Sequence, residues 1–299
     1  MKIVYSIVVV NYHSTDEIIT CLRSLINVHS VPDFEVIIVS NSELLDSEKE
    51  AVDNVLSHVK WIQMDQNIGY GQACNAGAAE SGGEYIFFLN PDTKFLNDTL
   101  VILKDSVDDH NKKAAAGPAT YNSDLDRVSS VKNKITLSWM MQWLCPPFGI
   151  LSNKSGSHDP RLYDETTEVD ILNGSAIFMH KSAYIDTGGF SDDYFMYWEE
   201  NDFCLTLKKH GYLILYTPEA KIIHDSGHST KQVFLPMEIE KHRSQKVFMN
   251  KHHPGLAKIN RLVGIMAYSW RLLGSLLLLR TEKVNQFRTL FIWYLVRYQ

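Results

Sequence analysis

The stretch EYIFFLNPDTKF, residues 84–95, joins an apolar run to an acidic turn. Residues 86–89 are apolar at every position, as in a central parallel strand that is buried on both faces. Pro91 has no amide donor and cannot continue the hydrogen-bond ladder of such a strand. Asp92 is therefore expected just past a strand end, where open α/β sheets bind ligands. Taken alone, the stretch fits a strand followed by an Asp in an ordinary turn at least as well.

Strand-like and helix-like runs alternate on the N-terminal side of this stretch. The pattern predicts strands over residues 3–10, 35–40, 60–65 and 84–90, and helices over residues 14–26, 45–59 and 69–81. Such alternation is typical of an α/β fold with a Rossmann-like, mostly parallel sheet and helices on both faces. Further along, residues 120–170 are rich in loops, residues 197–212 read as a helix that ends at Gly211, and residues 213–227 read as paired strands.

Size and composition fit a globular enzyme. The chain has 299 residues, of which 45% are hydrophobic and 21% charged, enough for one large domain or for one domain with an appendage. Its four cysteines form no C-x-x-C pair, which argues against a zinc ribbon or a redox dithiol and suits a reducing compartment. The apolar residues 3–10 are too few for a typical signal peptide, so we expect a cytoplasmic protein.

Charge divides the chain into an acidic body and a basic tail. Residues 241–299 hold 11 Lys/Arg and one Asp/Glu, whereas residues 1–240 hold 18 Lys/Arg and 34 Asp/Glu. A basic tail implies a polyanionic partner, either a nucleic acid or an anionic membrane surface. Residues 261–280 are apolar with aromatic side chains, which favours the membrane and not a nucleic acid.

The tail is expected to lie on the membrane, since a full span would put Arg271 near the bilayer centre at a cost of a few kcal/mol. We therefore expect a catalytic domain over residues 1–240, with its halves meeting near residue 120, and a helical extension over residues 241–299. The extension would hold the protein peripherally on the inner face of the cell membrane. Alternatively, its helices pack on the catalytic body or on a second subunit, as in a homo-oligomer.

The sequence resembles glycosyltransferases of the large inverting GT-A group, family 2, and among them the bacterial rhamnosyltransferases that build polysaccharides such as O-antigen. The resemblance covers residues 3–230. It rests on four motifs in this order: SIVVVNYHS, QNIGYGQACNAGAAESGGEYIFFLNPDT, NGSAIFMHKSAYIDTGGFSDDYFMYWEENDFCLTLKKHGY and IIHDSGHST. It implies the GT-A fold and transfer of a sugar from a nucleotide diphosphate.

Two acids in MYWEENDF are the candidate catalytic residues. A sugar hydroxyl is a poor nucleophile until a carboxylate removes its proton. Glu199 and Glu200 point about 100° apart on a helix, so they cannot face one oxygen equally. The family usually has Glu-Asp here with the second acid as the base, and the resemblance therefore implies Glu200, one methylene longer than the usual Asp. Without that resemblance, an acidic helix N-terminus stabilised by the helix dipole would be the leading interpretation.

The resemblance also implies a divalent cation, Mg²⁺ or Mn²⁺, that bridges the donor phosphates. The Asp-x-Asp motif of the family appears here as Asn90-Pro91-Asp92, with Asn90 in place of the first acid. Asp92 is the implied direct ligand, and His224 is the implied second ligand, because carboxylate and imidazole both suit Mn²⁺. Alternatively, His224 is a hydrogen-bonded structural histidine.

Donor-binding and acceptor-binding residues follow from the same motifs. The implied donor-binding residues are Val10, Asn11, Ser40, Asn41, Asn67, Gly69, Asn75, Asn90 and Asp92. Ser40 stands where the family usually has an Asp, and Asn41 is expected to compensate. The implied acceptor-binding residues are Asn173, Gly174 and Trp198; Trp198 either stacks on a sugar ring or fills the core.

The predicted function is transfer of a sugar, best matched by L-rhamnose, from a dTDP- or UDP-linked donor to a glycan or a lipid-linked saccharide. The alternative is a non-catalytic or scaffolding protein that uses the GT-A fold to bind a nucleotide sugar. The departures at Ser40, Asn90 and Glu200 are its support.

Overall fold

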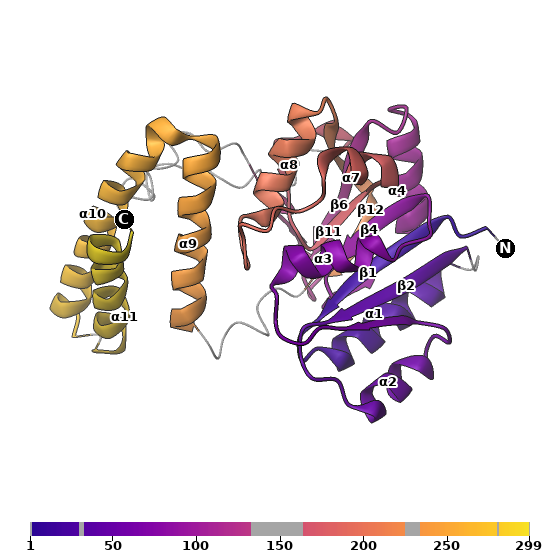
Figure 1. Ribbon diagram of the computed structural model, residues 1–299, viewed down its shortest axis with the longest axis horizontal. Helices are drawn as coiled ribbons and strands as arrows, with labels where there is room; N and C mark the ends of the chain where they lie inside the picture. Colours follow the sequence, from indigo (N-terminus) through magenta and orange to yellow (C-terminus); the bar gives the residue numbers. More distant parts are fainter. Residues whose placement is uncertain (1, 30–32, 133–163, 225–233, 280, 299) are drawn as a thin grey trace. The chain divides into compact units, whose positions relative to one another are not determined.

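Figure 1 shows the computed structural model, which describes residues 2–29, 33–132, 164–224, 234–279 and 281–298. The chain divides into two compact units. Unit 1 comprises Met1–Asn133, His158–Phe195 and Glu199–His228, and unit 2 comprises Lys134–Ser157, Met196–Trp198 and Ser229–Gln299. The division expected at residue 240 falls within helix α9 (Phe234–His252), so the helical unit includes residues upstream of that boundary.

A ten-stranded sheet forms the centre of unit 1, and its first part is parallel. The strands of this part are β1 (Tyr5–Asn11), β2 (Phe34–Ser40), β3 (Lys60–Gln63) and β4 (Tyr85–Leu89). They lie in the order β3-β2-β1-β4, with every neighbouring pair parallel. Every residue of β1 and β4 is buried, so the strands predicted in this part of the chain are confirmed.

The sheet continues beyond β4 with mixed strand directions, so antiparallel strands join the parallel pairs that the sequence predicts. The order is β4-β11-β6-β12-β5, and β11 runs antiparallel to both of its neighbours. The strands are β5 (Thr93–Phe95), β6 (Ala114–Tyr121), β7 (Arg127–Val128), β9 (Thr167–Glu168), β11 (Ala176–His180) and β12 (Leu213–His224). A separate antiparallel pair joins β8 (Val131–Lys132) to β10 (Ile171–Leu172).

Residues 213–224 form one long strand, β12, and the prediction of paired strands was wrong there. The chain stays parallel to β6 throughout, with a register shift between Thr217 and Lys221. Pro218 lies within this irregular segment, where a residue without an amide donor is tolerated. Pro218 and Glu219 therefore lie at an irregularity within the strand, and the strand ends at His224.

Helices cover both faces of the sheet, as predicted (Figure 1). On one face, α3 (Tyr70–Ala79), α7 (Lys181–Thr187) and α8 (Glu199–Lys209) bury apolar residues with Phe88. On the other, α1 (Thr15–Val28), α2 (Asp46–Asp53) and α4 (Thr99–Asp108) do so with Phe87. At Gly77 of α3 an added Cβ would lie 2.4 Å from Val8 Cγ1, so this glycine permits close helix–sheet packing.

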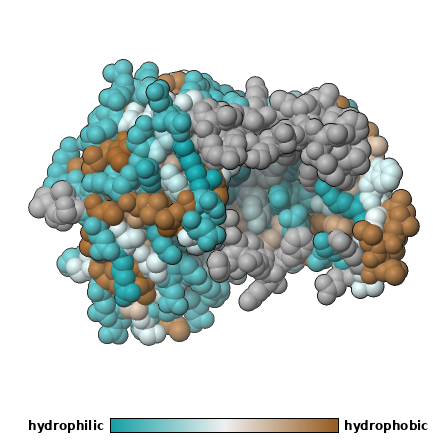
Figure 2. Space-filling model, turned by 180° about the vertical axis from the view of Figure 1, so that it is seen from behind, coloured by the Kyte–Doolittle hydropathy of each residue, from teal (hydrophilic) through white to brown (hydrophobic). Residues whose placement is uncertain are grey.

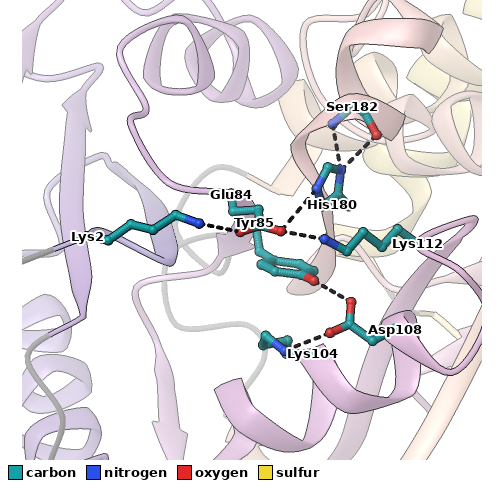
Figure 3. A network of polar contacts seen from close by, with 8 residues as sticks. All are labelled: Lys2, Glu84, Tyr85, Lys104, Asp108, Lys112, His180 and Ser182. Carbon is teal, nitrogen blue, oxygen red and sulfur yellow. Dashed lines mark hydrogen bonds and ion pairs between the residues drawn. The ribbon is translucent and has the colours of Figure 1, made fainter.

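A polar network fixes the amino end of β4 (Figure 3). The Glu84 carboxylate accepts hydrogen bonds from Lys112 and Lys2, and these bonds lower its pKa to about 2. The Tyr85 hydroxyl donates to Asp108, which also accepts a 2.7 Å bond from Lys104. One end of the strand is thus held by ion pairs, and its other end leads into the acidic turn.

Unit 2 contains α9, α10 (Pro254–Leu277), α11 (Thr281–Ile292) and the π-helical turn η3 (Trp293–Arg297). Its core gathers aromatic side chains around His242, whose Nε2 lies 2.7 Å from the Tyr268 hydroxyl and whose Nδ1 lies 2.9 Å from the Tyr294 hydroxyl. Burial lowers the pKa of His242 to about 4. None of the described helices combines the length and apolar character that a membrane span requires.

Candidate functional site

The two implied metal ligands lie beside each other at the carboxyl end of β4. His224 ends β12 and is paired across the sheet with Thr93, one residue after Asp92. Its Nε2 atom lies 3.2 Å from Asp92 Oδ1 and 3.4 Å from Asn90 Nδ2. The antiparallel β5–β12 pair therefore brings His224 next to Asn90 and Asp92, which precede it by more than 130 positions in the sequence.

The chemistry of this donor set fits a divalent cation. One carboxylate and one imidazole are acceptable ligands for Mn²⁺, and the carboxylate suits Mg²⁺. Among the described residues, no cluster of three or more His, Cys, Asp or Glu side chains is positioned to hold a metal. Asp92 and His224 could therefore provide only part of a coordination shell, as in sites where substrate phosphates and water complete it.

The two candidate catalytic acids open helix α8, and both are buried. Glu199 is 6% exposed and Glu200 is 7% exposed. The chain enters this helix through Tyr197 and Trp198, whose φ angles of 66° and 71° are uncommon for residues with a Cβ. Two consecutive residues with left-handed backbone conformation thus immediately precede α8.

Lys132 of β8 supplies a positive charge to the first turn of α8. Its Nζ atom lies 2.6 Å from Glu200 Oε1. Burial opposes the charge of Lys132, but the charge and hydrogen bond of Glu200, together with smaller contributions from Glu199 and Cys204, raise the Lys132 pKa. Glu200 is therefore held in an ion pair whose cation comes from a different element of the fold.

Glu199 lies in a different environment from Glu200. No hydrogen-bond donor of the described residues reaches its buried Oε2 atom. Burial, and next the charge of Glu200, raise the pKa of Glu199 above its usual range. Two adjacent acids of one helix thus differ in their polar surroundings, and only Glu200 has a direct cationic partner among the described residues.

One turn connects the acids to the end of β4. The Asn90 amide donates to the Ser175 carbonyl at 2.8 Å. An added Cβ at Gly174, the preceding residue, would lie 3.4 Å from Glu200 Cβ, so the Glu200 side chain packs on the same turn. The Tyr70 hydroxyl donates to the Gly174 carbonyl at 2.9 Å. Residues 173–175 therefore bring the predicted acceptor residues Asn173 and Gly174 next to the predicted base.

The polar residues at the ends of β1 and β2 bond to one another. Asn11 Nδ2 donates to Ser40 Oγ at 3.0 Å, and Ser40 Oγ donates to the Ser42 carbonyl at 2.9 Å. Asn11 Oδ1 accepts from both the amide and the hydroxyl of Ser14. Val10 pairs with Val39 in the same region. The Ser40 hydroxyl thus donates its hydrogen bond to the protein backbone. The contacts of these residues to a nucleotide-sugar donor stay a prediction.

Asn41 and Asn67 shape the turn before α3. Asn41 Nδ2 donates to the Gly69 carbonyl at 3.0 Å, and Asn67 Oδ1 accepts from the Gly69 amide at 3.0 Å. Gly69 has a φ of +88°, and an added Cβ would lie 2.0 Å from the Phe195 carbonyl oxygen. A side chain at this position is excluded on both counts, so the turn depends on glycine.

Two predicted binding residues, Asn75 and Trp198, are partly buried and have partners within the protein, and their contacts to a substrate stay a prediction. Asn75 Nδ2 donates to the Phe190 carbonyl at 2.8 Å, and Asn75 Oδ1 accepts from the Phe190 amide at 2.9 Å and from the Tyr184 hydroxyl at 2.5 Å. The Trp198 ring packs on Phe248, with ring centroids 5.0 Å apart. This contact is compatible with a packing role for Trp198, and stacking on a sugar ring stays a prediction.

Sequence reasoning did not single out Lys132 or Tyr70. Lys132 lies within residues 120–170, which read as rich in loops, and no motif marks it. Tyr70 lies within the recognised stretch NIGYGQACNAG, where an aromatic residue among glycines was the available signal.

Residues 6–182 match the sequence profile of Glycosyl transferase family 2, which is more than half of the chain. The chain belongs to this family. The protein is therefore a glycosyltransferase.

Several relatives are bacterial rhamnosyltransferases. The chain is 26% identical over 255 residues to N-acetylglucosaminyl-diphospho-decaprenol L-rhamnosyltransferase of Mycobacterium tuberculosis, covering 81% of each protein. It is 29% identical over 155 residues to rhamnosyltransferase WbbL of Escherichia coli, covering 50% of this chain and 56% of WbbL. It is 22% identical over 273 residues to dTDP-rhamnosyl transferase RfbF of Shigella flexneri, covering 88% of this chain and 84% of RfbF.

A solved structure supports the fold. The crystal structure of GalNAc-T7 with UDP, GalNAc and Mn²⁺ has a TM-score of 0.57 to this chain at 12% identity. The match covers 75% of this chain and 44% of GalNAc-T7, so the chain corresponds to less than half of that protein. The GT-A-like architecture expected from the sequence is confirmed.

The raised pKa of Glu199 predicts a pH-dependent effect of Glu199→Gln on stability. A glutamate in the unfolded chain ionises above about pH 4.3, whereas in the folded protein Glu199 keeps its proton to higher pH. Wild-type stability is therefore lost as pH rises through this interval, and a glutamine loses none. The melting temperature of Glu199→Gln minus that of wild type should increase by a few °C between pH 5 and pH 9, as measured by thermal unfolding.

Glu50→Gln, at an exposed position of α2, is the matched control and should show no such trend. A Glu199→Gln difference that stays constant with pH would contradict the assignment of a raised pKa to this group.

Proposed function

We propose that the protein transfers a sugar, best matched by L-rhamnose, from a dTDP- or UDP-linked donor to a saccharide carried on a lipid diphosphate, with inversion at the anomeric carbon. The proposal rests chiefly on one observation, namely that Glu200 and the end of β4 meet at the same turn, residues 173–175. The printed names of three relatives, all rhamnosyltransferases, support the donor sugar, and one of those names contains a lipid diphosphate.

In the proposed reaction Glu200 acts as the general base. The acceptor hydroxyl gives its proton to the Glu200 carboxylate as its oxygen forms a bond to the anomeric carbon. The bond from that carbon to the donor phosphate breaks at the same time, and the nucleoside diphosphate leaves with the electron pair. A single displacement from the opposite side inverts the configuration at the anomeric carbon.

The departing diphosphate needs its growing negative charge stabilised. Asp92 and His224 would hold a divalent cation, Mg²⁺ or Mn²⁺, which supplies that stabilisation when bound. Asn90, which replaces the first acid of the family motif, lies 3.4 Å from His224 and can donate a hydrogen bond but adds no charge. The nucleoside would lie along the ends of β1 and β2, near Val10, Asn11 and Ser40.

A non-catalytic nucleotide-sugar-binding protein is the second candidate. Asn90 favours it, because a missing carboxylate leaves the proposed metal site one negative charge short. Binding of a donor by calorimetry, with neither transfer nor donor hydrolysis, would select this candidate.

Glu200→Gln should lower the turnover number by roughly 10²- to 10⁴-fold, since an amide cannot take the acceptor proton. The assay is transfer from a panel of dTDP- and UDP-sugars to lipid-diphosphate-linked saccharides, with the anomeric configuration of the product read by NMR. Asp192→Asn, at an exposed position before α8, is the control and should keep wild-type turnover. Equal turnover of Glu200→Gln and wild type would move the base elsewhere, and a product of retained configuration would exclude the single displacement.

Asp92→Asn should weaken metal-dependent turnover by on the order of 100-fold or more, because the cation contributes several kcal/mol and each 1.4 kcal/mol is tenfold. Mn²⁺ binding, followed by electron paramagnetic resonance in the presence of UDP, should weaken in parallel. Asp124→Asn, an exposed acid of unit 1, is the control. Unchanged Mn²⁺ binding and turnover in Asp92→Asn would remove the proposed metal site.

We further propose that unit 2 places the protein on an anionic membrane surface. Six exposed apolar residues recur every three or four positions along α10 and so share one side of the helix: Ile259, Leu262, Met266, Trp270, Leu273 and Leu277, the α10 stripe. Figure 2 shows hydrophobic side chains gathered at the edge formed by the C-terminal helices. Exposed Lys and Arg side chains of the same helices, among them Lys258 and Arg288, complement an anionic lipid surface.

Replacing Leu262, Met266 and Trp270 together by Gln should reduce severalfold the fraction of full-length protein that sediments with phosphatidylglycerol vesicles. The control replaces three exposed apolar residues of unit 1, Leu45, Leu125 and Ile185, by Gln and should bind like wild type. Equal sedimentation of both triple variants would contradict the membrane role. A change in oligomeric state by light scattering, with vesicle binding intact, would instead assign the α10 stripe to a second copy of the chain.

A further inference from the structure

Lys132 faces the acid that the proposed reaction uses. Its Nζ atom lies 2.6 Å from Glu200 Oε1, within the range of a charge-assisted hydrogen bond. It comes from a two-residue strand outside the main sheet and from none of the motifs that define the family.

The backbone around Lys132 holds it toward α8. Lys132 is paired with Ile171 in the β8–β10 ladder, and β10 packs against α8. The adjoining residue Ser130 is tied on both sides, since its carbonyl accepts from the Asn173 amide at 2.8 Å and its hydroxyl donates to the Pro118 carbonyl at 3.0 Å. The ammonium group is thus carried by a segment that is hydrogen-bonded to the chain just before and within the turn at residues 173–175.

A base in this position has two needs that Lys132 meets. Two buried carboxyls in one helical turn repel each other when both are charged, and a cation in contact with one offsets both the repulsion and the desolvation of that acid. A glutamate also has one more rotatable bond than the aspartate usual in the family, and an ion pair restricts that freedom. In this chain the longer glutamate side chain at position 200 therefore occurs together with a lysine that restricts its conformation.

We propose that Lys132 is the positioning residue of the catalytic base: its ammonium holds one carboxylate oxygen of Glu200 in place, so that the other oxygen can accept the proton of the acceptor. This inference rests on the proposed function of Glu200.

Other titratable groups near Glu200 do not replace this cation. Tyr70 of α3 and Cys204 of α8 both interact with the charge of Glu200, but neither side-chain type can carry a positive charge. Burial raises the pKa of each, so both stay neutral near neutral pH. Glu199 is the remaining neighbour, and it is an acid. Among the described residues, the positive charge in contact with Glu200 is that of Lys132.

The test compares Lys132→Met and Lys132→Arg with Lys208→Met, a control that removes a lysine of α8 paired with Asp170 and Glu168. Lys132→Met should lower kcat by roughly 10- to 100-fold, less than loss of the base itself, with the KM values for donor and acceptor unchanged. The acidic limb of its kcat/KM profile should move to higher pH, since the base then ionises without a cation. Lys132→Arg should recover most of kcat, and Lys208→Met should resemble wild type.

A second measurement is independent of turnover. Glu200→Gln should lower the melting temperature in the wild-type background, because it breaks the ion pair, and raise it in the Lys132→Met background, because it removes an unpaired buried charge. If the wild type transfers no sugar, this cycle still reports the pair, and the failure then belongs to the proposed function. The positioning role is overturned if Lys132→Met keeps the wild-type kcat and pH profile, or if it only raises the acceptor KM.

Discussion

The antiparallel pairing of β11 with β4 is the constraint on which the candidate site depends. Because the two strands run in opposite directions, the start of β11 must lie at the carboxyl end of β4, and Ser175 accepts the hydrogen bond of the Asn90 amide there. A parallel β11 would begin at the amino end of β4, where Glu84 lies among Lys2, Lys112 and His180. One strand direction thus determines that Glu200 and Asp92 are near the same turn.

Electrostatics at this turn are balanced by contributions from several elements. Asp92 contacts His224 from the last strand, and Glu200 contacts Lys132 from a strand of the small sheet, so each of these acids has a partner from a remote part of the chain. Glu199 has no such cation and retains its proton to higher pH. Left-handed backbone at Tyr197 and Trp198 costs roughly 1–3 kcal/mol for each residue and persists only where surrounding contacts require it.

Local sequence signals predicted the first half of the sheet, because buried strands and amphipathic helices have distinct periodicities. They could not predict the direction of β11, since a five-residue apolar strand reads the same in either direction. They predicted paired strands over residues 213–227, whereas residues 213–224 form one strand with an irregularity that accommodates Pro218. Asp92, His224 and Glu200 were identified through motifs. The hydrogen bonds of Asn41 and Asn75 to backbone groups could not be predicted, because the amide of an asparagine bonds a backbone group as readily as a ligand; their contacts to the donor stay a prediction.

The three hydrogen bonds of Asn75 have a mechanical consequence. They join α3 to Phe190 and Tyr184, which lie in the segment that precedes α8. Tyr70 adds a fourth hydrogen bond, from its backbone amide to the Phe195 carbonyl. A rotation of α3 would therefore displace this segment as well, because four hydrogen bonds connect the two.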